Sequence, residues 1–186
     1  MRLDNYIKVY NDVISQEFCD EIISEYSGED WIPGTINDFK ITEYRKCDVV
    51  YLSNKKIIKK NQEKRKRIDD KIFDIFDKML EKYFEEFDSL KYINVEGDTG
   101  YMLLRYNTDD YVCEHVDTHS GQHRTLSCSL ILNDGYEGGE ISFFNNKYKP
   151  MLMRGDLLIF PSGFAYPHQV LPVKSGIRYS IVTWIR

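Results

Sequence analysis

The 186-residue sequence predicts a mainly β domain with supporting helices near its N-terminus, an α+β arrangement. Two patterns in the sequence favour this arrangement, one on each side of Tyr101. From Tyr101 onward, short β-rich runs alternate with turn residues, whereas apolar residues before Tyr101 recur at helical spacing. Hydrophobic residues make up 42% of the chain and aromatic residues 14%, enough for a sizeable core. A chain of this length is expected to form one domain, or one domain with a helical addition.

The first hundred residues predict a helix, a strand and a longer helix. Ser15 suits the N-cap of a helix over "SQEFCDEIISEY", and Gly28 suits its end. The apolar residues Phe18, Ile22, Ile23 and Tyr26 fall on one side of that helix. A strand is expected near residues 41–52, because "KITEYRKCDVVYLS" alternates and is rich in β-formers.

The longer helix follows a basic segment, residues 55–67. This segment is interpreted either as a nucleic-acid patch or targeting signal, or as a solvated first turn of the following helix or a loop, since acidic residues follow at once. The sequence "IDDKIFDIFDKMLEKYFEEF" then predicts a helix that packs against a sheet. Its apolar positions at helical spacing are Ile68, Ile72, Ile75, Phe76, Met79, Phe84 and Phe87.

Eight short β-rich runs occupy the rest of the chain: "YMLLRY", "YVCEHVD", "RTLSCSLILN", "GEISFF", "KPMLM", "DLLIFP", "PHQVLPV" and "RYSIVTWI". Segments rich in Gly, Asn, Asp and Pro separate them, which is typical of turns. So many short strands predict a sandwich or barrel, with a jelly roll among the choices. We therefore divide the chain into a supporting region, residues 1–100, and a β core, residues 101–186.

Composition also limits the location and partners of the protein. The formal net charge of −5 argues against non-specific nucleic-acid binding by the whole surface. The four cysteines include no CxxC pair, so reduced thiols in a cytosol-like compartment are expected. The N-terminal sequence does not resemble a signal peptide, and no run approaches the ~18 apolar residues of a membrane span. The sequence therefore favours a cytoplasmic protein that does not bind membranes.

Three of the four histidines lie in "EHVDTHSGQH". If "HVD" is on a strand, His115 and Asp117 point to the same face, and His168, on a later predicted strand, can supply a third ligand. Two histidines and one carboxylate form the facial triad of non-haem Fe(II) oxygenases. A surface pair is the alternative for "HVD". His119 and His123 are expected in a solvated loop.

An arginine, Arg178, follows His168 by ten residues. If "PVKSG" is a hairpin turn centred near Val173, His168 and Arg178 face one another across adjacent strands. The guanidinium group would then point toward the metal ligands, where it can bind a carboxylate bidentately.

Four segments together resemble the Fe(II)- and 2-oxoglutarate-dependent dioxygenases of the prolyl 4-hydroxylase type: "RYNTDDYVCEHVD", "SLILNDGYEGGEISFF", "KPMLMRGDLLIFP" and "PHQVLPVKSGIRYSIVTWIR". The resemblance covers residues 101–186, and the region before it is similar more loosely. It implies a double-stranded β-helix (jelly-roll) core. It also implies Fe(II), 2-oxoglutarate and O2 as cofactors, with ascorbate in addition, and hydroxylation of a C–H bond with succinate and CO2 as co-products.

By position, the resemblance makes His115, Asp117 and His168 the iron ligands. It assigns Arg178 to the distal carboxylate of 2-oxoglutarate, and it places Trp184 on the same strand face.

The resemblance also assigns Tyr106 and Tyr111 to the walls of the cosubstrate and substrate cavity. Core packing is the alternative for Tyr111, as it is for Trp184. Ile131 stands where some relatives have a tyrosine that binds the distal carboxylate. Ser129, Ser127 and Tyr106 are the candidates for the replacing hydroxyl.

Peptidyl proline is the first choice of substrate, on the resemblance alone. One alternative keeps the chemistry but acts on a free amino acid, a small metabolite or a nucleobase. Another is a jelly-roll binding protein without catalysis.

Overall fold

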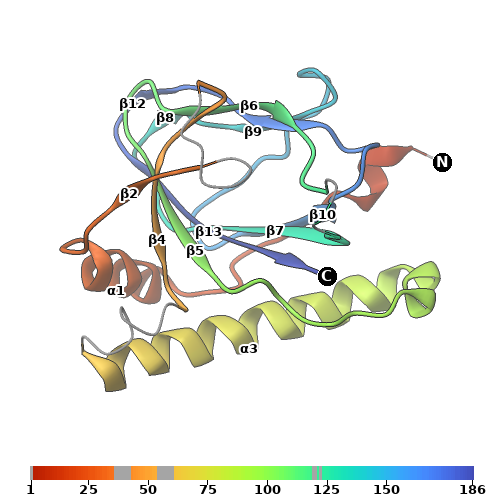
Figure 1. Cartoon of the computed structure of the whole chain (residues 1–186), viewed down its shortest axis with the longest axis horizontal. Helices are drawn as coiled ribbons and strands as arrows, with labels where there is room; N and C mark the ends of the chain where they lie inside the picture. Colours follow the sequence, from red (N-terminus) through yellow and green to blue (C-terminus); the bar gives the residue numbers. More distant parts are fainter. Residues whose placement is uncertain (1, 36–42, 54–60, 119–120, 122) are drawn as a thin grey trace.

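A computed structural model describes residues 2–35, 43–53, 61–118, 121 and 123–186. In it two β-sheets face one another, and helices cover the outer side of the larger sheet (Figure 1). The larger sheet has the order β1 (Lys8–Tyr10), β10 (Leu157–Pro161), β7 (Leu126–Ile131), β13 (Arg178–Ile185), β5 (Met102–Tyr106), β4 (Asp48–Tyr51), β2 (Ile32–Pro33). The smaller sheet has the order β3 (Arg45–Lys46), β6 (Tyr111–His115), β11 (His168–Val170), β9 (Ile141–Phe143). A separate pair joins β12 (Val173–Ser175) to β8 (Glu137–Gly138), and all these pairings are antiparallel.

Two α-helices, α1 (Gln16–Tyr26) and α3 (Gln62–Glu86), lie beneath the larger sheet in the view of Figure 1. The Ser15 hydroxyl accepts a hydrogen bond from the Phe18 amide at 3.3 Å, so the predicted N-cap of α1 is confirmed. Short 3-10 helices span η1 (Leu3–Tyr6) and η2 (Asp88–Tyr92). In the described part of the chain, no helix combines the length and apolar composition that crossing a membrane requires.

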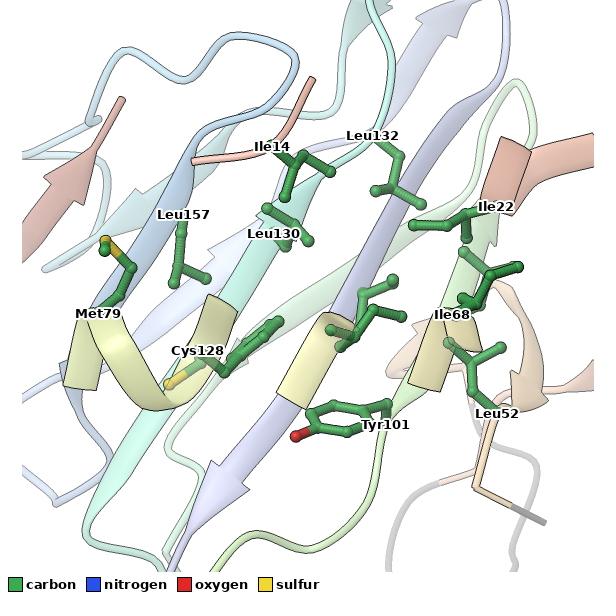
Figure 2. Close-up of a cluster of buried hydrophobic side chains, with 14 of the residues drawn as sticks. Ile14, Ile22, Leu52, Ile68, Met79, Tyr101, Cys128, Leu130, Leu132 and Leu157 are labelled. Atoms are coloured by element: carbon green, nitrogen blue, oxygen red, sulfur yellow. The ribbon is translucent and has the colours of Figure 1, made fainter. Parts of the chain in front are cut away.

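The central strands of the larger sheet are buried on both faces, and their side chains alternate between two layers. On β7, Cys128 and Leu130 face the helices, whereas Ser127 and Ser129 face the smaller sheet. Figure 2 shows Cys128 and Leu130 in the helix-side cluster with Met79 of α3. The second layer lies between the sheets and includes Leu104, Tyr106, Phe143, Leu158 and Phe160. The functional side chains therefore come from the inter-sheet faces.

Two strand predictions are corrected by the structure. The strand expected near residues 41–52 is two strands, because the chain passes at Cys47 from β3 in the smaller sheet to β4 in the larger one; residues 41 and 42 lie outside the described part. The run "KPMLM" forms no strand, and Met151 and Met153 are exposed. The other seven β-rich runs each contain a strand, and the sequence did not predict the two-residue β8.

The hairpin expected around Val173 is wrong. His168 is on β11, which pairs with β6 and β9, whereas Arg178 is on β13, which pairs with β5 and β7. Val173 begins β12, which pairs with β8. The two residues are therefore not neighbours across one ladder. They belong to opposite sheets.

Candidate metal centre

His115, Asp117 and His168 come together between the two sheets. His115 is the last residue of β6 and lies directly opposite His168, the first residue of β11. His115 Nε2 is 3.4 Å from Asp117 Oδ1, and His168 Nε2 is 3.4 Å from Asp117 Oδ2. One candidate ligand atom from each residue lies within 4.8 Å of the others. Asp117 lies just beyond the end of β6 rather than on the strand, yet its carboxylate still faces both imidazoles.

Backbone carbonyls orient both imidazoles. His115 Nδ1 lies 2.8 Å from Cys113 O, and His168 Nδ1 lies 3.1 Å from Tyr166 O. A carbonyl can only accept, so each Nδ1 carries the proton and each Nε2 keeps its lone pair for a metal. Two neutral nitrogens and one carboxylate are a donor set that suits Fe(II) and leaves positions open.

Asp117 is buried, with 6% of the residue exposed, and its carboxylate is held in its ionised form. The Ser127 hydroxyl donates to Oδ2 at 2.6 Å, and a second serine, Ser162, lies 2.7 Å from Ser127 Oγ. Burial alone would raise the pKa of Asp117, but His168, His115 and Ser127 together hold it well below its usual range. Burial also lowers the pKa of His168, against the attraction of Asp117, and thus favours the neutral imidazole that binds metals.

The three side chains line a cavity of about 1130 Å³ between the sheets. Arg178 lines the same cavity and is 2% exposed. Its Nη1 donates to Ser180 Oγ at 3.0 Å, and its Cζ lies 5.1 Å from the centre of the Tyr106 ring. Ser129 and Trp184 line the cavity too, and Trp184 is on the face of β13 that carries Arg178, as expected. Arg178 thus enters the cavity from the larger sheet, opposite the histidines.

Tyr111 does not line the cavity, contrary to the assignment that the resemblance implied. Val170 pairs with Val112, and His168 pairs with His115. One residue separates the two positions on β11, whereas two residues separate their partners on β6, so β6 contains a bulge. The bulge shifts the alternation of side chains along β6, so the Tyr111 side chain lies on the face of the smaller sheet that points away from the cavity. Its hydroxyl donates to Glu43 O at 2.8 Å.

Ser180 and Arg124 are two of the cavity residues that sequence reasoning missed. Ser180 is two residues from Arg178 on the same strand, so strand alternation alone predicts that it shares the face of Arg178. Arg124 precedes β7 and is not part of a strand, so no periodicity of the sequence indicates where its side chain points. Burial lowers the pKa of Arg124, and the charge of Arg45 lowers it further, against the attraction of Asp117. Ile131 is buried opposite Ser180 and does not line the cavity.

The remaining candidates divide between described and undescribed residues. His123 is exposed and lines the cavity, while His119 lies outside the described residues. In the basic segment, residues 55–60 are outside the described part, and residues 62–67 belong to α3. Each of its four cations there contacts an acid: Lys64 and Arg65 contact Glu25, Lys66 contacts Asp70, and Arg67 contacts Glu21. These ion pairs neutralise the described part of the segment and favour a solvated first part of the helix over a nucleic-acid patch.

Residues 101–186 match the model of the 2OG-Fe(II) oxygenase superfamily. A PKHD-type hydroxylase of Synechococcus sp. (strain CC9902) is 34% identical over 90 residues, which are 45% of this chain and 40% of that protein. A PKHD-type hydroxylase of Prochlorococcus marinus (strain MIT 9215) is 40% identical over 77 residues, 38% of this chain and 34% of that protein. The chain therefore matches less than half the length of these relatives.

Solved structures share the fold over nearly the whole chain. A prolyl hydroxylase from Trichoplax adhaerens, in complex with a hypoxia inducible factor peptide fragment, superposes with a TM-score of 0.79 at 17% identity. It covers 97% of this chain and 83% of its own. A viral collagen prolyl hydroxylase from Paramecium Bursaria Chlorella virus-1 gives a TM-score of 0.68 at 19% identity, covering 97% of this chain and 96% of its own.

Residues 101–186 are thus similar in sequence to 2OG-Fe(II) oxygenases, and the whole chain shares its fold with the solved structures. The superfamily match over residues 101–186 and the PKHD-type relatives support the sequence resemblance to Fe(II)- and 2-oxoglutarate-dependent dioxygenases of the prolyl 4-hydroxylase type. The predicted mainly β fold with a jelly-roll core is confirmed.

Proposed function

We propose that this chain is an Fe(II)- and 2-oxoglutarate-dependent dioxygenase that hydroxylates a C–H bond, with peptidyl proline as the first choice of substrate. One observation carries the proposal: two imidazole Nε2 atoms and a carboxylate converge in a cavity that a buried arginine, Arg178, also lines. The superfamily match and the PKHD-type relatives support the chemistry.

In this proposal His115, Asp117 and His168 hold Fe(II). Such a triad leaves positions for other ligands. When bound, Fe(II) with 2-oxoglutarate and O2 supplies the oxidation of an unactivated C–H bond and yields succinate and CO2. The backbone carbonyls of Cys113 and Tyr166 keep both ligand nitrogens free of protons, so metal binding needs no proton release from them.

Arg178 is proposed to bind the distal carboxylate of 2-oxoglutarate. Ser180 fixes its guanidinium group by a hydrogen bond, and the face of Tyr106 lies beneath it. With no carboxylate within 4.0 Å among the described residues, its charge is available to an anionic ligand. Tyr106 and Ser129 are proposed to line the cosubstrate part of the cavity, and Trp184 the substrate part.

The substrate is tested by measuring succinate together with the gain of one oxygen atom by each candidate. Pro-rich peptides, free proline and single-stranded oligonucleotides are compared, with Fe(II) and 2-oxoglutarate, and with or without ascorbate. Hydroxylated peptide with matching succinate is expected from the wild type and not from Asp117→Ala. If only free proline or only an oligonucleotide is hydroxylated, that compound rather than a peptide is the substrate. Equal succinate from the wild type and Asp117→Ala would end the proposal.

A further inference from the structure

The cavity holds more positive charge than metal and cosubstrate binding requires. Its charged lining, besides the histidines, consists of Arg45, Arg124, Arg178, Arg186, Glu96 and Asp117. If Asp117 binds iron and Arg178 binds 2-oxoglutarate, three arginines and one glutamate remain. This excess is notable in a chain whose formal net charge is −5.

Arg124 is the best placed of the remaining arginines. Its Cζ lies 3.8 Å from the centre of the Trp184 ring, and its Nη1 donates to Asp117 O at 3.3 Å. Its Nε is buried and has no hydrogen-bond partner in the described structure. Stacking on the ring fixes the plane of the guanidinium group, and a buried donor without an acceptor costs free energy. The group is therefore oriented for an acceptor that the described residues do not supply.

Arg45 adds a second unneutralised cation to the same cavity. Its Nη1 donates to Thr35 O at 3.3 Å, and its Nε donates to Cys47 Sγ at 3.2 Å. Both partners are uncharged. Among the described residues, no carboxylate oxygen lies within 4.0 Å of Arg45 or Arg124. A guanidinium group can bind a carboxylate bidentately, since its fork of donors matches the two carboxylate oxygens.

We propose that Arg124, with Arg45 lining the same cavity, binds a carboxylate of the substrate, so that the enzyme selects acidic peptides. This inference rests on the proposed function, and it names the substrate class of the same site. The carboxylate belongs to an Asp or Glu side chain near the hydroxylated residue, or to the C-terminus of the peptide. The position of Arg124, stacked on Trp184 and bonded to the backbone of Asp117, puts that carboxylate close to the metal centre.

The test combines enzyme variants with paired peptides. Each Pro-containing peptide with an Asp near the proline is matched by one with Asn, and each free C-terminus is matched by an amide. Wild type should hydroxylate the acidic member with a kcat/KM about tenfold higher or more, as for the loss of one charge-assisted contact. Arg124→Gln should reduce this preference to within about twofold, and Arg124→Lys should restore part of it.

The preference ratio separates this role from a structural one. Damage to the metal site through the Asp117 contact would lower kcat/KM for both members of a pair and leave the ratio unchanged. A wild type without preference, or an Arg124→Gln variant that keeps the full preference, would overturn the inference. The pair that shows the preference, Asp against Asn or carboxylate against amide, identifies the source of the carboxylate.

Binding to the Zn(II)-loaded chain, measured by calorimetry, separates this inference from the proposed function. Acidic peptides that bind in an Arg124-dependent way without hydroxylation would refute the function and keep the subsite. Peptides hydroxylated equally well whatever their charge would keep the function and refute the subsite. If oligonucleotides bind where peptides do not, and bind more weakly to Arg124→Gln, the proposal that Arg124 binds a peptide carboxylate is refuted.

Discussion

The Ser127 hydroxyl lies 2.6 Å from Asp117 Oδ2 and fixes the carboxylate that faces both imidazoles. Ser127 is on β7 of the larger sheet, whereas His115 and His168 are on the smaller sheet. This hydrogen bond therefore connects the candidate metal centre to the opposite wall of the cavity. A partner of this kind orients a metal ligand and raises metal affinity without touching the metal.

Ser127→Ala is expected to weaken Fe(II) binding by roughly 10–100-fold, because the carboxylate loses its orienting donor. Ser127→Thr keeps the hydroxyl and should bind nearly as well. Ser129→Ala is the matched control for metal affinity, since Ser129 shares the strand and the cavity wall but does not bond to Asp117. Anaerobic Fe(II) titration of the three variants checks this. Equal affinity in Ser127→Ala and Ser129→Ala would refute the orienting role.

Arg178→Ala should weaken 2-oxoglutarate binding by roughly tenfold to a few thousandfold, because it leaves the distal carboxylate without its charge partner. Arg178→Lys should be milder, since lysine keeps the charge but loses the fork of donors. Fe(II) affinity should hardly change in either variant. Titration of 2-oxoglutarate into each Fe(II)-loaded variant measures the effect. Unchanged affinity in Arg178→Ala would refute the assignment of Arg178 to the distal carboxylate.

Gly139→Ala should weaken 2-oxoglutarate binding and leave Fe(II) affinity unaltered. Gly139 has φ +68°, and a Cβ there would lie 3.0 Å from Arg178 Cδ and 3.0 Å from Val173 Cγ2. The methyl group would therefore displace the arginine. Gly135→Ala is the control, because Gly135 has φ +82° but nothing within 4 Å of the added Cβ. If both variants lose the same affinity, backbone strain rather than contact with Arg178 is the cause.

Arg65→Met should destabilise the fold by about 3 kcal/mol at neutral pH, near the lower end for breaking a buried ion pair. The Arg65 guanidinium is buried and contacts Glu25 at 2.7 Å and Glu29 at 2.6 Å; Lys64 and Asn61 still contact Glu25 in the variant. Arg67→Met is the exposed control and should cost less than about 1 kcal/mol. Urea denaturation compares the free energies of unfolding, and equal losses would refute the account.

The same ion pair predicts a dependence of stability on pH. Burial raises the pKa of Glu25, but hydrogen bonds from Arg65, Lys64 and Asn61 outweigh it and lower the pKa below its ordinary value of 4.5. The unfolded chain then binds a proton more readily, so this contribution is present above pH 4.5 and is lost as the pH falls through the folded-state pKa. Between neutral and acid pH, wild type should lose more stability than Arg65→Met in urea denaturation. Parallel losses would contradict this prediction.

Local patterns predicted the parts of the fold that depend on neighbouring residues. The N-cap at Ser15, the period of α3 and most strands follow from spacing and turn residues. The pairing of strands does not, because it depends on contacts between distant segments. The wrong hairpin around Val173 is an example: a short separation in sequence indicated adjacent strands, but β11 and β13 lie in opposite sheets.

The candidate site shows the same limit. His115 and Asp117 could be paired from their spacing, and Trp184 could be placed with Arg178 by strand alternation. Tyr111 could not be placed, because the bulge in β6 is visible only in the register with β11. The Ser127 contact could not be predicted either, since it joins residues of different sheets.

The most direct test is a calorimetric titration of 2-oxoglutarate, under anaerobic conditions, into the chain with and without Fe(II). We expect one 2-oxoglutarate per chain with Fe(II). Its affinity should fall by about tenfold or more without the metal and in Asp117→Ala, because the cosubstrate then loses its metal contacts. Equal affinity with and without Fe(II), or no binding to the Fe(II)-loaded wild type, would contradict the assignment of His115, Asp117 and His168 as the iron site of a 2-oxoglutarate oxygenase.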